Sequence, residues 1–375
     1  MDKTDNFSGL LDSILSKEDY TKKDLLYLIG LKKPEELEKL YKKAYEVKEI
    51  FVGKKVYYRG LIEFSNRCIK DCYYCGIRLG NKNIERFDMT RSEILKMAEW
   101  AYENRYGSLT LQSGERQDKD FVIYITELIK DIKKIGNGSL GLTLCLGEQT
   151  EETYKKWFDA GGHRYLLRIE TTNKELYRKI HPDNERHSFE RRKSCLKGLK
   201  KIGYQVGTGV MIGLPGQTEE DMINDIYFFK EMDIDMIGMG PYIVHKDTPL
   251  GKKVLSSGEN DEIKKYERFS YGLKMIAITR IFLKDVNIAA TTALQAINPL
   301  GREMGLKAGA NILMPIITIP EHREKYQLYD NKPCIDDNAD QCKVCLTGRV
   351  MSVGDRVGFG EWGDSPHFRK PVSKR

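Results

Sequence analysis

The sequence predicts an α/β fold, a full (β/α)₈ barrel of the TIM type, and three observations support it. A length of 375 residues suits such a barrel with extensions. A 40% share of hydrophobic and 31% of charged residues is typical of a soluble globular chain with a large core. Eight short β-rich runs alternate with longer amphipathic stretches. The predicted strands are residues 56–64, 108–113, 139–147, 164–170, 205–213, 235–242, 287–294 and 310–316.

The elements before the first strand are predicted to be helices that form an N-terminal extension over residues 1–54. One helix ends near Gly30, and a second begins with Pro34 in its first turn and ends before Gly53. This helical preface precedes the barrel, which we expect over residues 55–320.

Helices between the strands carry recognisable start signals. Thr90 is the expected N-cap of one helix, with Glu93 at the capping-box position, and Thr218 is the expected N-cap of another. Residues 321–375 do not continue the alternation of strands and helices. We expect a C-terminal extension there, with a Gly-rich basic tail that is partly ordered.

The charge distribution argues against nucleic acid as a partner. The net charge of +7 comes from 62 basic and 55 acidic residues that are mixed along the chain, without a basic run interleaved with aromatic residues. An anionic small molecule would explain the positive bias as well. The N-terminal sequence lacks the apolar core of a secretory signal, and no apolar run reaches the roughly 18 residues of a membrane span. We therefore expect no membrane partner and a cytoplasmic location.

The eight cysteines are too few and too unevenly spaced for a secreted disulfide scaffold. Cys145 and Cys195 stand alone in apolar surroundings and are predicted to pack as small hydrophobic residues. The other six form two tight triplets, which in a reducing compartment indicate metal or cluster ligation. The triplets are Cys68, Cys72 and Cys75, and Cys334, Cys342 and Cys345.

The first triplet has the spacing C-x3-C-x2-C and follows directly on the first predicted strand. Structural zinc sites normally have four ligands, and a cubane bound by four cysteines has one thiolate for each iron. Three thiolates leave one iron open to an exogenous ligand. A zinc knuckle or a chance cluster is the alternative. The segment "FSNRCIKDCYYCGIR" resembles the radical S-adenosylmethionine (SAM) superfamily, in which SAM chelates the open iron and is cleaved reductively.

That resemblance also assigns roles to residues near other predicted strand ends. Tyr74, just before the third cysteine, would shield the cluster near the adenine. "LQSGE" resembles the superfamily's Gly-Gly-Glu motif, which receives the methionyl ammonium, although Ser113 replaces the first glycine. Arg168 and Glu170 are two residues apart and so share one face of a strand. They either pair with each other, or Glu170 binds the ribose or ammonium of SAM while Arg168 faces the substrate.

Motifs along nearly the whole chain resemble the HydE family of [FeFe]-hydrogenase maturases. They include "YLLRIET", "GLPGQT", "HKDTPL", "AATTAL", "GANILMP" and "YQLY", in that order. The resemblance implies substrate or anion contacts at Arg168, Thr291 and Thr292. For Met236 and Met314 core packing is an equal alternative, and Thr291 and Thr292 also suit a plain strand. The implied SAM contacts are Tyr74, Gln112, Ser113, Gly114, Glu115, Glu170, Arg192, Met236, Met314, Tyr326 and Tyr329.

The same resemblance implies the cofactors, substrate and partners. The cofactors are SAM and a [4Fe-4S] cluster with one open iron. The substrate is a small iron complex with carbonyl, cyanide and cysteine ligands, supplied by the partner maturase HydG. The maturase HydF acts downstream, and an external donor provides electrons. The second triplet, Cys334, Cys342 and Cys345, matches an accessory [2Fe-2S] or [4Fe-4S] pattern of some members, with adventitious metal or no metal as alternatives.

One position departs from the family pattern. Ile169 stands where the family more usually has a histidine, between Arg168 and Glu170. The change alters only a hydrogen bond at the edge of the pocket, or it marks a paralogue with another substrate. Rival functions are a methylornithine- or biotin-synthase-type enzyme acting on a small organic substrate, and a non-enzymatic iron–sulfur carrier.

Overall fold

The computed structural model describes residues 3–371, with side chains from residue 9 onward. Eight parallel strands form the predicted barrel in the order β10-β1-β2-β3-β4-β5-β7-β9. A bridge between Ala289 and Ile312 joins the two ends of this order, so the ring closes. The strands are β1 (Lys55–Ser65), β2 (Ser108–Ser113), β3 (Gly141–Cys145), β4 (Arg164–Leu166), β5 (Gln205–Thr208), β7 (Met236–Ile237), β9 (Asn287–Ile288) and β10 (Ile312–Leu313).

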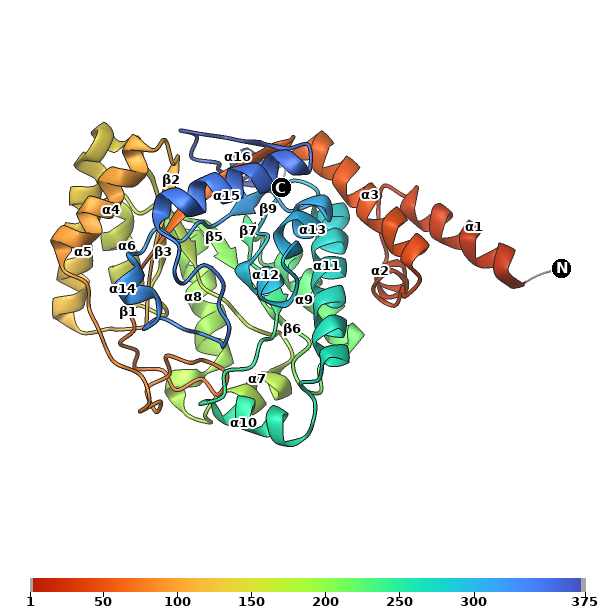
Figure 1. The fold of residues 1–375 in the computed structure, drawn as a ribbon, viewed down its shortest axis with the longest axis horizontal. Coiled ribbons are helices and arrows are strands. Elements are labelled where there is room, and N and C mark those ends of the chain that lie inside the picture. Colours follow the sequence, from red (N-terminus) through yellow and green to blue (C-terminus); the bar gives the residue numbers. More distant parts are fainter. Residues whose placement is uncertain (1–2, 372–375) are drawn as a thin grey trace.

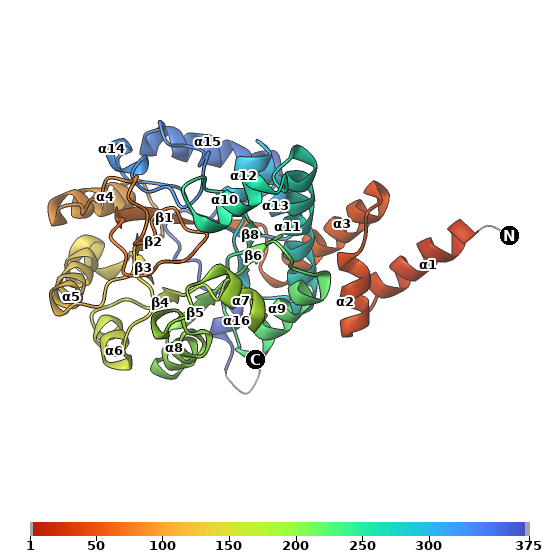
Figure 2. The ribbon, with the colours of Figure 1, turned by 90° about the horizontal axis from the view of Figure 1, so that it is seen from below.

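An outer layer of helices surrounds the strands (Figures 1 and 2). Both predicted helix starts are confirmed. Thr90 and Glu93 form a capping box, and Thr218 caps the later helix, with Asp221 as its capping-box partner. The barrel helices are α4 (Arg91–Glu103), α5 (Lys119–Lys134), α6 (Glu151–Asp159), α7 (Lys174–Ile180), α8 (Phe189–Ile202), α9 (Glu219–Glu231), α10 (Pro249–Ser256), α11 (Glu262–Leu283), α12 (Thr292–Ile297) and α13 (Gly301–Lys307), with 3₁₀ turns η1 (Ile135–Gly138) and η2 (Glu185–His187).

The later strands are shorter than predicted. The runs 205–213 and 235–242 each break in two, and their second halves, β6 (Met211–Ile212) and β8 (Gly240–Pro241), form a separate parallel pair. A Cβ atom at Gly209 would lie 1.9 Å from the carbonyl oxygen of Gly238, so these two segments of the backbone approach too closely for any side chain at position 209. Each break therefore separates a barrel strand, β5 or β7, from the separate pair formed by β6 and β8.

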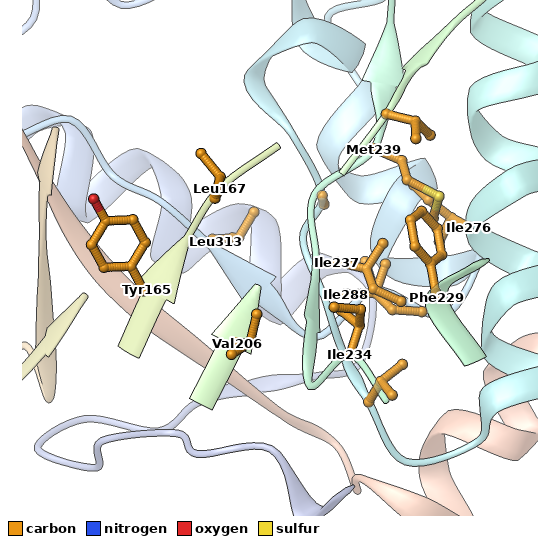
Figure 3. Packing of buried hydrophobic residues seen from close by; sticks show 14 of the residues in the cluster. Tyr165, Leu167, Val206, Phe229, Ile234, Ile237, Met239, Ile276, Ile288 and Leu313 are labelled. Carbon is orange, nitrogen blue, oxygen red and sulfur yellow. The ribbon is translucent and has the colours of Figure 1, made fainter. Parts of the chain in front are cut away.

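The main core fills the space between the barrel and its helices. In Figure 3, Ile237 and Ile288 from the strands lie near Phe229 of α9 and Ile276 of α11, and each of these side chains is at most 2% exposed. Burial of this apolar layer fixes the helices around the barrel.

Three helices precede the barrel, as predicted: α1 (Lys3–Leu15), α2 (Lys22–Ile29) and α3 (Pro34–Phe51). Helices α2 and α3 pack against α11, whereas α1 projects away from the barrel (Figures 1 and 2). Among the described helices, none combines the length and apolar character that crossing a membrane requires.

The C-terminal segment is more closely integrated than the expected partly ordered tail. It contains α14 (Pro320–Arg323), α15 (Ala339–Ser352), β11 (Arg356–Val357) and α16 (Pro366–Arg369), and β11 pairs with the start of β1. Arg164 and Gln205, near the N-terminal ends of β4 and β5, hydrogen-bond to Asp364 at 2.7 and 3.0 Å. Asn287 donates to the carbonyl oxygen of Gly363. The segment therefore forms a floor under the barrel.

Candidate active site

A cavity of about 390 Å³ occupies the barrel interior. Its wall contains side chains from the cysteine loop that follows β1 and from residues near the ends of most other strands. Every residue to which we assigned a role at the first cluster, SAM or the substrate lies on this wall. These residues are Cys68, Cys72, Tyr74, Cys75, Gln112, Ser113, Gly114, Glu115, Arg168, Glu170, Arg192, Met236, Thr291, Thr292, Met314, Tyr326 and Tyr329.

The loop with the first cysteine triplet is fixed by main-chain contacts. The amide of Ile69 donates to the carbonyl oxygen of Glu115 at 2.9 Å, and the amide of Glu115 donates to Cys68 Sγ at 3.3 Å. A Cβ atom at Gly114 would lie 2.2 Å from the carbonyl oxygen of Arg67. Glycine at 114 is therefore required for strand β2 to approach the cysteine loop this closely.

The three thiols of this loop are suited to a metal cluster. Burial raises the pKa of Cys68 and Cys75, and raises that of Cys72 to about 12. A bound metal reverses this preference, because its charge stabilises the thiolate. Within residues 3–371, no group of three His, Cys, Asp or Glu side chains is arranged to hold one metal ion. Cysteine thiolates are the usual ligands of iron–sulfur clusters, so a multi-iron cluster fits this donor set.

Tyr74 belongs to this loop and faces His181 at the C-terminal end of α7. Its hydroxyl is 3.5 Å from Nε2 of His181, and the two rings meet edge to face with centroids 5.4 Å apart. Burial raises the pKa of Tyr74 well above its ordinary value, so its hydroxyl stays protonated. The residue therefore forms a rigid aromatic wall beside the three cysteines.

A buried ionic network connects the cysteine loop to the strand ends. Lys70, from the loop, lies 3.4 Å from a carboxylate oxygen of Glu115 and 3.0 Å from one of Glu148. Arg192 of α8 donates to Glu148 at 2.8 Å. Burial raises the pKa of Glu148, but Arg192 and Lys70 more than offset this effect, so the net shift is downward. Sequence reasoning missed Lys70 and Glu148, although Glu148 lies just after β3, where barrel sites form.

Arg168 and Glu170 both face the cavity and form an ion pair. Arg168 donates from Nε and Nη2 to the carboxylate of Glu170 at 2.9 to 3.0 Å, and from Nη1 to the carbonyl oxygen of Gly238 at 2.6 Å. The pairing alternative is therefore realised, with both side chains still exposed to the cavity. Ile169 points the other way and is fully buried in the core, so this position does not contribute to the cavity wall.

Thr291 and Thr292 are on the cavity wall but not in a strand. Thr291 is the N-cap residue of α12, and Thr292 is the first residue of that helix, so the predicted strand 287–294 is wrong beyond Ile288. Thr291 donates its hydroxyl proton to the carbonyl oxygen of Met239 at 3.1 Å. The hydroxyl of Thr292 accepts a hydrogen bond from Arg302 at 3.0 Å, so its own proton is left to donate to a ligand.

The segment after β10 contributes the last part of the wall. Tyr326 is 1% exposed and hydrogen-bonds to Gln112, while burial raises the pKa of Tyr329. Lys332 pairs with Glu63 at 2.6 Å, and both line the cavity. No local pattern could predict this pair, because its members are 269 positions apart.

The second cysteine triplet lies outside the cavity. Cys334, in the loop before α15, hydrogen-bonds to Cys342 on that helix, and this bond lowers the pKa of Cys342 to about 7. Cys345 is exposed and accepts a hydrogen bond from Arg349 at 3.4 Å. Two of the three thiols are therefore in contact, and the third is on the surface one turn further along the helix.

The two single cysteines differ in their surroundings. Cys195 packs against the main core, as predicted. Cys145, the last residue of β3, instead lines the cavity, so its assignment as a packed core residue is wrong. Burial raises its pKa to about 12, which keeps the thiol neutral. Its position at the end of a barrel strand could have predicted a place on the cavity wall, but its apolar neighbours in the sequence suggested core packing instead.

Comparisons with known proteins agree with this site. A model described as the radical SAM superfamily matches residues 62–229. Together with the cysteine-lined cavity of the barrel, that match defines the class: this protein is a radical SAM enzyme. The [FeFe] hydrogenase maturase subunit HydE of Thermotoga maritima is 42% identical over 350 residues, which cover 93% of this chain and 95% of that protein. The chain belongs to the HydE family.

More distant relatives share the architecture. 3-Methylornithine synthase of Methanosarcina barkeri is 27% identical over 332 residues, which cover 87% of this chain and 88% of that protein. The crystal structure of methylornithine synthase (PylB) superposes with a TM-score of 0.77 at 24% identity, covering 94% of this chain and 98% of that one. HydG from Carboxydothermus hydrogenoformans gives a TM-score of 0.76 at 18% identity, covering 95% and 80% of the chains. The two structures support the fold.

Proposed function

We propose that this enzyme cleaves SAM reductively and acts on an organometallic precursor of the [FeFe]-hydrogenase H-cluster, an iron with two carbonyls, a cyanide and a cysteine as ligands. The observation that supports it most is 42% identity to HydE over 93% of the chain. The cavity that combines three cysteines, an arginine–glutamate pair and two threonines agrees with that role.

We assign Cys68, Cys72 and Cys75 to a [4Fe-4S] cluster with one iron free of protein ligands. When bound, that cluster supplies the electron that splits SAM into methionine and a 5′-deoxyadenosyl radical. A fourth cysteine would occupy the iron that SAM must chelate. Superfamily membership implies both cofactors, and the buried thiols beside Gly114 fit the cluster chemically.

The remaining wall residues would bind and orient SAM. Glu170 has carboxylate lone pairs beyond those that Arg168 uses, so it can also accept a bond from the ribose or the ammonium group. Tyr74, whose ring meets that of His181 edge to face, would shield the cluster and contact the adenine. The proposed SAM contacts are Tyr74, Gln112, Ser113, Gly114, Glu115, Glu170, Arg192, Met236, Met314, Tyr326 and Tyr329.

Arg168, Thr291 and Thr292 would bind the anionic substrate. A guanidinium has five N–H donors, and Arg168 uses three of them on Glu170 and Gly238, so two are left for a ligand. Thr292 keeps its hydroxyl proton for the same purpose, because its oxygen already accepts from Arg302. These donors suit a complex with cyanide and carboxylate groups inside the barrel.

We further propose the partners, the cellular location, the second cluster and the domain division of this enzyme. HydG would supply the substrate, HydF would receive the product, and an external donor would reduce the cluster in the cytoplasm. Cys334, Cys342 and Cys345 would hold an accessory [2Fe-2S] or [4Fe-4S] cluster. The chain would divide into a helical extension (1–54), a barrel (55–320) and a C-terminal extension (321–375).

The decisive experiment gives the reconstituted, reduced protein SAM and a synthetic iron–carbonyl–cyanide–cysteine complex. We expect 5′-deoxyadenosine in the product analysis and an adenosylated iron species in the EPR spectrum. SAM cleavage without the iron species would favour a paralogue with a small organic substrate. This is the main rival function, because a relative at 27% identity is named 3-methylornithine synthase. No 5′-deoxyadenosine at all would favour an iron–sulfur carrier instead.

A further inference from the structure

A second cavity, of about 560 Å³, lies outside the barrel interior. Its lining comes from residues 174–191, which include α7, the turn η2 and the start of α8. Among the described residues, none lines both this outer cavity and the one inside the barrel. Sites for small molecules typically have volumes of roughly 300 to 1,000 Å³, so the outer cavity is large enough for a ligand of its own.

The segment that lines the outer cavity is attached directly to the cysteine loop. The amide of Asp71 donates to Nε2 of His187 at 2.9 Å, and Lys70 donates to the carbonyl oxygen of Arg186. Lys70 lines the barrel cavity, whereas His187 lines the outer one. The cysteine loop and this segment therefore form the wall between the two cavities.

Aromatic rings in contact cross this wall. The ring of Tyr74 meets His181 edge to face with centroids 5.4 Å apart, and His181 stacks on Tyr177 at 4.0 Å. Tyr177 in turn meets Phe189 edge to face at 5.4 Å. At one end, Tyr74 lines the barrel cavity and hydrogen-bonds to Cys72. At the other end, Tyr177 and Phe189 line the outer cavity. The distances are ordinary for packed aromatic pairs, so the row of rings has no gap.

Polar groups of the outer cavity lack partners in the described part of the chain. Tyr177 is 1% exposed, and its hydroxyl group is buried without a hydrogen-bond partner. Arg178 has no carboxylate oxygen within 4.0 Å, and Asp183 and Glu185 have no cationic nitrogen within that distance. An unsatisfied buried hydroxyl is costly, and a ligand that accepts its proton would remove the cost. The cavity therefore offers donors and acceptors beside an aromatic surface.

We propose that the outer cavity binds the isoalloxazine ring of a reduced flavin and is where the electron for the cluster enters. Because it serves the external electron donor, this site rests on the proposed function. The planar ring can stack on Phe189, and its pyrimidine edge has one N–H between two carbonyl groups. Tyr177 and Arg178 can donate to the carbonyl groups, and Asp183 can accept from the N–H. The ring belongs to a free flavin or to a flavin carrier protein.

The transfer moves one electron from a flavin hydroquinone anion to the oxidised cluster. The flavin becomes a neutral semiquinone, the cluster is reduced by one electron, and no proton is exchanged. Electron transfer slows steeply as the gap between donor and acceptor widens, so a flavin on Phe189 is favoured by the packed rings that lead to Tyr74. Entry from outside also leaves the barrel cavity free for SAM and the substrate.

The test measures electron exchange in the downhill direction, since the same path serves both directions. Cluster-reconstituted protein is reduced with titanium(III) citrate, desalted, and mixed in a stopped-flow instrument with oxidised riboflavin, oxidised flavodoxin or ferricyanide, without SAM. Recovery of the cluster absorbance gives the rate. We expect Phe189→Leu to be oxidised by a flavin acceptor at least tenfold more slowly than wild type, and by ferricyanide at the same rate. Tyr266→Leu is the matched control, because it removes a 59% exposed ring that lines neither cavity.

A rate that depends on Phe189 with riboflavin would identify a diffusible flavin as the donor, and one that depends on it with flavodoxin alone would identify a carrier protein. Equal rates in wild type and Phe189→Leu with both flavin acceptors would overturn the proposal. An equal slowing by ferricyanide would also overturn it, because the change would then not concern a stacked ring. If Phe189→Leu does not fold, Arg178→Met decides, with a rate at least threefold below wild type expected and an equal rate refuting the site. A protein that takes up no cluster would instead contradict the proposed function, so the two failures are distinguishable.

Discussion

Replacing Glu148 by glutamine should destabilise the protein through the ionic network behind the cysteine loop. The carboxylate of Glu148 is completely buried, 2.8 Å from Arg192 and 3.0 Å from Lys70, which are themselves 7% and 4% exposed. Removing one member of a buried ion pair costs about 3 to 5 kcal/mol. Glu115 still compensates Lys70 at 3.4 Å, so we expect the lower end, about 3 kcal/mol.

That loss corresponds to about a hundredfold in the folding equilibrium and, for a chain of this length, to a thermal midpoint lower by about 4 °C. The assay is thermal unfolding followed by circular dichroism, together with the iron retained after reconstitution, which should fall because Lys70 belongs to the cysteine loop. Glu220→Gln is the control, since its pair with Lys22 is 42% and 63% exposed and should contribute little. A Glu148→Gln midpoint within 1 °C of wild type would mean a destabilisation far smaller than about 3 kcal/mol. That result would refute the reasoning.

Three further predictions concern the cluster, the close approach of β2 and the floor. Cys72→Ala should abolish SAM cleavage, whereas Cys342→Ala should leave it largely intact; equal losses in 5′-deoxyadenosine yield would contradict this division. Gly114→Ala should prevent iron incorporation, because its Cβ would lie 2.2 Å from a carbonyl oxygen of the cysteine loop, while Gly348→Ala, with nothing within 4 Å, should load iron normally. His163 lies 3.4 Å from Asp364 of the floor, and burial lowers the pKa of His163 to about 4. Wild type should therefore lose stability as pH falls from about 6.5 to 4, since the unfolded state binds the proton first. A His163→Gln variant whose urea midpoint falls as steeply over that range would rule this out.

Much of the barrel could be predicted because its signals are local. β2 coincides with the predicted run 108–113, and Thr90 caps its helix as expected, since capping and strand patterns depend on residues a few positions apart. The resemblance to the HydE family implied the site residues, and several of them lie at the ends of predicted strands. Residues at the ends of parallel barrel strands meet at one end, so Gln112 and Glu170 reach one cavity although 58 positions separate them.

The errors arose where distant contacts decide the structure. Thr291 and Thr292 have the composition of a strand, but Thr292 begins a helix directly after a two-residue strand. Composition alone also could not show that Asp364, in the glycine-rich tail, hydrogen-bonds to Arg164 and Gln205. Lys332 and Glu63 pair across 269 positions. No local pattern reports such contacts, because tertiary packing overrides propensity.

The floor also constrains the order in which the chain folds. Arg164, Gln205 and Asn287 each have a hydrogen-bond partner among residues 362–365, which a ribosome makes after all eight barrel strands. A growing chain that has completed its barrel strands therefore still has polar groups at the base of the ring open to water. We expect the barrel to mature from an open-ended intermediate, in which strands can already pair while the interior stays hydrated until the last segment docks.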